Sequence, residues 1–152
     1  MNAASDTQRW AIAIKQPNAW AVIHAGKDVE NRSATAIRAY RPAVGHRVYI
    51  HSSKGMTRAE YERAAEFMAK IGVRCPAPDE LARGGIIGSV LVVGIVTAHR
   101  SRWFRGPYAL VSSTHGQRRS SQRGSVPAVH ALIEIAISVE AIAKTLPVGS
   151  VG

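Results

Sequence analysis

The sequence predicts an α+β fold, mainly β, in which a small β-barrel has helices packed against it. Two observations predict this. Several short apolar stretches alternate with a period of two, which is typical of strands. Two stretches between them have the apolar spacing and the end signals of helices. A chain of 152 residues that is 46% hydrophobic can bury one sizeable core, so we expect the strands and helices to form one domain.

The first strand and the first helix are predicted next to each other. The segment "RWAIAIK", residues 9–15, alternates as a strand does. "QPNAWAVIHAG" follows it, with Pro17 placed to open a helix and Gly26 placed to close it. We therefore expect a strand over 9–15 and a short helix over 17–25.

A second strand and a longer helix follow. In "GHRVYIHSS", residues 45–53, Val48 and Ile50 fall on one face and Tyr49 and His51 on the other. Thr57 then stands three residues before Glu60, the spacing of a capping box, and apolar residues continue at helical spacing. This predicts a helix over about 57–70. Residues 73–85 hold two prolines and two glycines and are predicted to be mostly loop.

The last strands are predicted from apolar runs. Residues 86–99 form a long β-branched run in which Gly88 and Gly94 mark places where a barrel strand can bend. Residues 106–113 read as another strand. The segment after it is basic and low in complexity, which indicates a mobile linker, and residues 129–146 have apolar spacing that favours a helix.

The charge and the composition of the chain restrict the classes of molecule that we expect it to bind. Twenty Lys and Arg against ten Asp and Glu give a formal charge of +10, which favours polyanionic partners. Cys75 is the only cysteine, so an internal disulfide and a cysteine-based zinc site are excluded. The six histidines lie far apart, and we expect no metal and no cofactor. The first residues lack the pattern of a signal peptide, and no apolar stretch is long enough to span a membrane. We expect a cytoplasmic protein that does not bind a membrane.

Four stretches in a particular order carry a family resemblance. They are "QPNAWAVIHAGKDVENRS", "YIHSSKGM", "GGIIGSVLVVGIVT" and "SRWFRGPYALV". Together they resemble the ASCH family over roughly residues 10–111. The resemblance implies a PUA-like β-barrel that binds RNA or a nucleotide in a cleft beside the Gly-Lys turn. We expect this core to span residues 1–111, followed over 112–152 by the basic linker and a C-terminal segment.

Some relatives in this family remove an acyl group from a modified cytidine. In those relatives a threonine follows the lysine by three residues, and a later glutamate completes the set. In this sequence Lys27 fits, but Glu30 stands in the threonine position, and "GSVLVVG" has no acidic residue. We therefore expect RNA or nucleotide binding. Hydrolysis by Lys27 and Glu30, of an N4-acylated cytidine or of the RNA backbone, is the alternative, and an adaptor that contacts only proteins is a third.

The stretch "HAGKDVENRS" has two interpretations. Lys27 follows a predicted helix end, where a cation interacts with the helix dipole, so the cluster can be a helix cap with surface ion pairs. Alternatively, Lys27 and Glu30 lie at the mouth of the cleft, and Arg32 binds a phosphate or orients Glu30. In an enzyme, a desolvated Lys27 would be the general base and Glu30 would hold it in place.

Further candidates come from three other places. Trp20 either stacks on a base or belongs to the core. The strand end at His51 either lines the cleft or is solvated. "HRSRWFRGPY" mixes arginines with aromatic residues, as phosphate contact and base stacking require. The predicted ligand-binding residues are Trp20, Gly26, Lys27, Asn31, Arg32, His51, Ser52, Ser53, Lys54, Arg102, Trp103 and Arg105.

Overall fold

The computed structural model describes residues 9–113, and all structural statements refer to that range. The expected helix over 129–146 and nearly all of the expected linker lie outside it. Ser112 and Ser113 are described, and they end the last strand.

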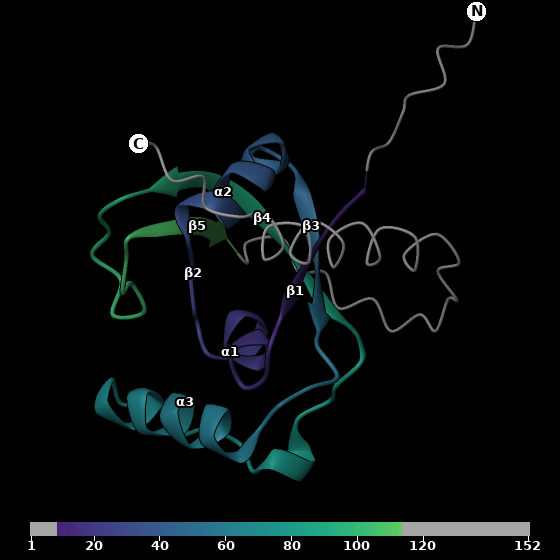
Figure 1. The fold of residues 1–152 in the computed structure, drawn as a ribbon, viewed down its shortest axis with the longest axis vertical. Coiled ribbons are helices and arrows are strands. Elements are labelled where there is room, and N and C mark those ends of the chain that lie inside the picture. Colours follow the sequence, from purple (N-terminus) through teal and green to yellow (C-terminus); the bar gives the residue numbers. More distant parts are fainter. Residues whose placement is uncertain (1–8, 114–152) are drawn as a thin grey trace, which may run out of the picture.

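Five strands form one sheet (Figure 1). They are β1 (Trp10–Ile14), β2 (Val29–Arg32), β3 (Arg47–Ser52), β4 (Gly85–Val96) and β5 (Tyr108–Ser113). Their order is β1-β3-β4-β5-β2. β1 and β3 are parallel, and the other three pairings are antiparallel. The predicted α+β, mainly β fold class is therefore confirmed. Over residues 9–113 the sheet is not closed into a barrel, because β1 and β2 remain its outer strands.

Three α-helices accompany the sheet: α1 (Asn18–His24), α2 (Ala34–Ala39) and α3 (Arg58–Lys70). Short 3₁₀ turns follow at Arg41–Ala43 and Pro78–Glu80. α1 and α3 lie where the sequence predicts helices, and α2 was not predicted. Figure 1 shows α2 at one end of the curved sheet, and α1 and then α3 at the other.

α3 begins as its sequence predicts. The Thr57 hydroxyl accepts a hydrogen bond from the Glu60 amide, and the Glu60 carboxylate accepts one from the Thr57 amide. This reciprocal pair satisfies two amides that a helix start leaves without partners. The Glu60 carboxylate also accepts a hydrogen bond from Lys15, which follows β1, so the start of α3 lies close to the end of that strand.

The glycines of β4 lie beside irregularities in its pairing. The register with β3 shifts between Ile50 and His51, opposite Gly88, and the register with β5 shifts between Val92 and Gly94. A Cβ at Gly88 would lie 2.7 Å from Ile23 Cδ1. Glycine at this position therefore lets α1 pack closely against β4.

Two groups of buried side chains hold these elements together. The larger group fills the space between the sheet, α1 and α2 and includes Ile12, Val22 and Leu110. The smaller one joins α3 to the sheet through Met68 and Trp103, both almost fully buried. α3 is therefore anchored mainly through its C-terminal half. None of the helices described is long and apolar enough to cross a membrane.

Candidate functional site

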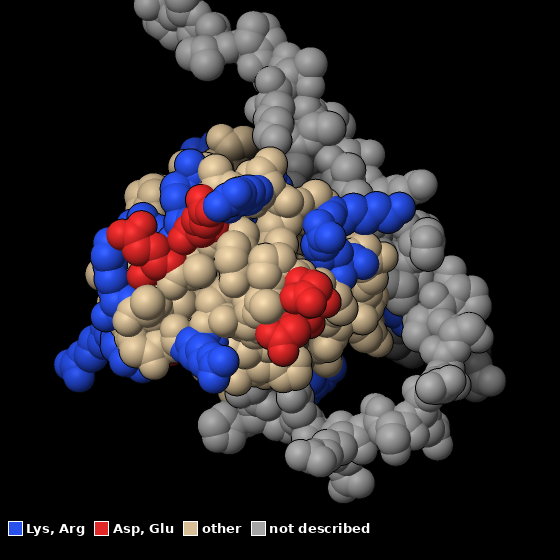
Figure 2. Space-filling model, turned by 90° about the horizontal axis from the view of Figure 1, so that it is seen from below, with Lys and Arg blue, Asp and Glu red and all other residues tan. Residues whose placement is uncertain are grey.

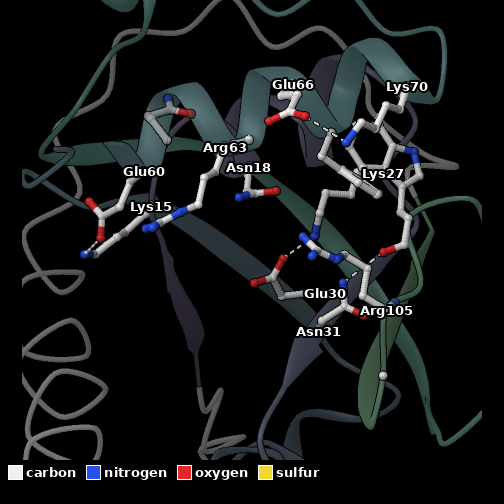
Figure 3. Close-up of a pocket in the computed structure, with 15 residues that line it drawn as sticks. Lys15, Asn18, Lys27, Glu30, Asn31, Glu60, Arg63, Glu66, Lys70 and Arg105 are labelled. Carbon is white, nitrogen blue, oxygen red and sulfur yellow. Dashed lines mark hydrogen bonds and ion pairs between the residues drawn. The ribbon is translucent and has the colours of Figure 1, made fainter. Parts of the chain in front are cut away.

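A pocket of about 750 Å³ lies between α3 and the rest of the domain (Figure 3). The end of β1, the start of α1, β2 and the loop before β5 form one side of it, and α3 forms the other. The lining residues are Lys15, Gln16, Asn18, Lys27, Glu30, Asn31, Glu60, Arg63, Ala64, Glu66, Phe67, Lys70, Trp103, Arg105 and Gly106. Five of the predicted site residues are among them: Lys27, Glu30, Asn31, Trp103 and Arg105.

Lys27 is buried in the wall of this pocket, with 4% of the residue exposed. Gly26, whose φ is +67°, reverses the chain at the end of α1 so that the Lys27 amide can donate to the Ala21 carbonyl at 3.1 Å. The Lys27 ammonium donates to the Val29 carbonyl at 2.8 Å and to the Glu30 carboxylate. An ammonium has three N–H groups. One of them is therefore left without a hydrogen-bond partner among the described residues.

Glu30 lies between two cations. One carboxylate oxygen forms the ion pair with Lys27, and the other is 3.6 Å from the Arg32 guanidinium. Arg32 also donates to the Ala13 carbonyl of β1 at 2.9 Å and lies over the Tyr40 ring, 5.4 Å from its centroid. Arg32 thus orients Glu30 from the side away from the pocket, and it links the two outer strands of the sheet.

Asn31 positions the loop before β5. Its side-chain amide donates to the Trp103 carbonyl at 2.9 Å, and its side-chain oxygen accepts from the Arg105 amide at 2.8 Å. The Arg105 guanidinium lies 4.9 Å from the centroid of the Phe67 ring on α3. Asn31 therefore acts as a support for the loop that brings Arg105 to the pocket.

The α3 wall is rich in charged groups. Glu66 pairs with Lys70 at 2.8 Å, and Glu60 pairs with Lys15 across the pocket entrance. The bond from Lys15, followed by the bond from the Thr57 amide, lowers the pKa of Glu60 to about 2. Arg63 forms no ion pair or hydrogen bond within residues 9–113. In Figure 3, Arg63 and Lys15 approach the pocket from one side and Lys27 and Arg105 from the other, with Asn18 between them.

Two other predicted site residues, Trp20 and Arg102, contact the core and a helix end rather than the pocket. Trp20 is half-buried against the smaller core group, and its amide donates to the Gln16 side chain at 2.8 Å. Arg102 donates to the Ile71 carbonyl at 2.6 Å, which caps the end of α3. Neither residue lines the pocket, nor do Gly26 and Arg32.

The predicted strand-end residues lie at the end of β3, outside the pocket lining. His51 and Ser52 are buried. The Ser52 hydroxyl donates to the Ala82 carbonyl, and the Ser53 amide donates to the Ile14 carbonyl at 3.0 Å. Lys54 is exposed beside Gly84. This strand end is tied to its neighbours rather than open to the pocket.

Sequence reasoning missed the α3 side of the pocket. Arg63, Phe67 and Lys70 lie on one face of α3, at the helical spacing of three and four residues. That spacing was the available signal, because it places two cations and an aromatic ring together on one face of the helix. The sequence alone, however, does not place this face opposite Lys27.

Residues 31–59 and 97–133 are two basic stretches of the sequence without an acidic residue. Among their basic residues that lie within the described range 9–113, Arg105 is the one that lines the pocket. Figure 2 shows the face on the α3 side, where acidic and basic side chains lie next to one another around an uncharged centre. In the described part of the chain, no three His, Cys, Asp or Glu residues are placed to hold a metal ion.

The sequence was compared with protein-family models and with curated proteins. No family model matches it, and no curated protein is significantly similar to it.

Proposed function

We propose that the protein is a PUA-like ASCH-domain protein that binds RNA or a nucleotide in the pocket between α3 and β2. One observation carries this proposal. Five cationic side chains line the pocket against three carboxylates, and two of the cations, Arg63 and Arg105, have no carboxylate partner among the described residues. An unneutralised guanidinium in a pocket favours an anionic ligand group, and a phosphate accepts its forked hydrogen bonds.

The other lining groups fit a nucleotide. A volume of about 750 Å³ is in the range of pockets that enclose one small ligand. The remaining N–H of Lys27 and the side-chain amide of Asn18 can bond to carbonyl or hydroxyl groups of a base or ribose. These groups add directional contacts to the attraction between charges.

The PUA-like barrel is supported by the way the sheet curves. β1 and β2 are the outer strands, yet the Arg32 side chain of β2 reaches the Ala13 carbonyl of β1. The outer strands therefore approach within the length of one side chain. We propose that the sheet is a partly open barrel of the PUA-like kind, with Arg32 at the seam.

One observation favours hydrolysis as a second candidate. Lys27 and Glu30 are in direct contact, and both face a pocket that can hold a nucleoside. An ammonium at this position can donate to the carbonyl oxygen of an acyl group as negative charge develops on it. The substrate would be an N4-acylated cytidine or the RNA backbone.

Calorimetric titration with cytidine and with cytidine 5′-monophosphate tests the binding proposal. We expect the monophosphate to bind at least tenfold more tightly, because hydrogen bonds to charged groups contribute about 1.5–3 kcal/mol. Arg63→Gln and Arg105→Gln should each remove most of this difference. Arg74→Gln, at an exposed arginine outside the pocket, is the control. Equal affinity for the two ligands, or no binding of either, would contradict the proposal.

The same samples test hydrolysis. Incubation with N4-acetylcytidine and with short RNA, followed by chromatography, should give product only if the second candidate is right. Product formation that is lost in Lys27→Met and retained in Arg74→Gln would favour an enzyme that uses this pocket.

A further inference from the structure

The described carboxylates of the domain lie towards one of its two ends, whereas cations occur at both. Every carboxylate among residues 9–113 belongs to one of three places: the start of β2, helix α3, or the 3₁₀ turn that follows α3. These residues are Asp28, Glu30, Glu60, Glu62, Glu66, Asp79 and Glu80. In Figure 1 the end with α3 is opposite the end with α2. The α2 end therefore carries no described carboxylate that could neutralise its cations.

Four exposed arginines gather at the α2 end: Arg9, Arg38, Arg41 and Arg47. We name them the α2-end basic surface. Arg9 and Arg47 immediately precede Trp10 and Val48, which are paired in the parallel ladder of β1 and β3. These two arginines therefore stand side by side at the start of neighbouring strands.

Arg38 and Arg41 are also neighbours. They are three residues apart, and Tyr40 between them has helical backbone angles, so both side chains leave the same side of the chain. Two tight turns then lead to β3, since the Val44 amide donates to the Arg41 carbonyl and the His46 amide to the Ala43 carbonyl. These turns bring Arg41 close to Arg47 at the start of β3.

The backbone that carries these arginines is fixed by the sheet. The Gly45 amide donates to the Val92 carbonyl at 2.8 Å, and the Val92 amide donates to the His46 carbonyl at 3.0 Å. None of the four arginines forms an ion pair within residues 9–113, and the only hydrogen bond that their guanidiniums form in that range joins Arg47 to the Ser89 hydroxyl at 3.2 Å. The surface therefore presents guanidiniums on a rigid frame.

We infer that the α2-end basic surface is a second nucleic-acid contact, which binds the phosphate backbone of a single-stranded RNA independently of the pocket. The choice of RNA as the partner rests on the function proposed above. Guanidiniums that are spread over an exposed surface fit a repeating polyanion better than one small anion, which needs donors converging on a single point. Binding here would be independent of sequence, because phosphate contacts carry no sequence information.

Fluorescence anisotropy with a labelled 20-nucleotide RNA of mixed sequence, over a series of KCl concentrations, tests the inference on the full chain. The variant is Arg38→Gln with Arg41→Gln, two exposed positions outside the core. Each lost phosphate contact lowers the slope of log K against log salt by about 0.7, so the double variant should lower it by about 1.4. At 150 mM KCl this corresponds to roughly a tenfold loss of affinity.

The control is Arg74→Gln with Arg83→Gln, which removes the same charge from exposed positions elsewhere. It should change RNA affinity much less. A second measurement, the affinity for cytidine 5′-monophosphate, should be the same in the Arg38/Arg41 variant and the wild type. Equal losses of RNA affinity in both double variants would overturn the inference, because net charge alone would then explain binding.

The outcomes separate this inference from the proposed function. RNA binding that depends on Arg38 and Arg41, in a protein that does not bind the mononucleotide, would support the surface and contradict the pocket. If the protein binds the mononucleotide and its RNA affinity is unchanged in the Arg38/Arg41 variant, the result would support the pocket and contradict the surface. Vesicles with 30% phosphatidylserine serve as a competing polyanion. Binding to them that depends on Arg38 and Arg41, without RNA binding, would also overturn the inference.

Discussion

Replacing Lys27 by methionine should destabilise the fold, because the structure buries this lysine. Lys27→Met keeps most of the side-chain volume but leaves Glu30 without its closest cation and the Val29 carbonyl without the lysine donor. Breaking a buried ion pair by removing one partner typically costs about 3–5 kcal/mol. The Glu30 side chain is 16% exposed and still has Arg32 at 3.6 Å. We therefore expect the free energy of unfolding to fall by somewhat less than this range, about 2–3 kcal/mol.

Urea unfolding followed by tryptophan fluorescence measures this change, and a double-mutant cycle isolates the pair. The cycle uses Lys27→Met, Glu30→Gln and both together, and it should give a coupling energy of about 1–3 kcal/mol. The exposed pair Lys15–Glu60 is the matched control and should couple much more weakly. A free energy of unfolding that is unchanged in Lys27→Met, with no coupling to Glu30, would refute the buried placement and favour a surface ion pair behind a helix end.

Three further predictions concern α3 and the loop that follows it. Met68→Ala should destabilise the protein by about 2–5 kcal/mol in urea unfolding, because the fully buried Met68 joins α3 to the core; a smaller loss would mean that α3 is not anchored there. The bond from Lys15 lowers the pKa of Glu60 to about 2. The stability that wild type gains over Glu60→Gln should therefore be constant above about pH 5 and disappear as the pH falls from about 4.5 to about 2; a melting-temperature difference that is flat down to pH 2 would contradict this. Burial raises the pKa of the Cys75 thiol, so iodoacetamide at pH 7.5 should alkylate it more slowly than free cysteine, and equal rates would disprove it.

Local signals in the sequence predicted most of the fold. The period-two stretches predicted β1 and β3, the apolar runs predicted β4 and β5, and the Thr57–Glu60 spacing predicted the start of α3, because these patterns depend on neighbours within a few residues. The same holds for the contact between Lys27 and Glu30, three residues apart. α2 was missed although Ser33 caps it, since a helix of six residues has too little apolar periodicity to stand out.

What could not be predicted depends on contacts between distant segments. The pocket exists because α3 lies opposite β2, and the bonds that fix its edges join residues 45 and 72 positions apart, Lys15 to Glu60 and Asn31 to Trp103. Burial on both faces at the end of β3 was not predicted either: Ile50, His51 and Ser52 follow one another and are all buried. Period-two alternation predicts one buried face, and the neighbouring segments that cover the second face are distant in sequence.

The central claim, that the pocket under α3 takes an anionic nucleotide, is tested most directly by a nuclear magnetic resonance titration. Backbone amide shifts of the ¹⁵N-labelled full chain would be followed while cytidine 5′-monophosphate is added. We predict saturable shifts grouped at Lys27–Asn31, at Arg63–Phe67 and at Trp103–Gly106, the segments that line the pocket. Saturable shifts grouped elsewhere, or no shifts at millimolar nucleotide, would contradict it.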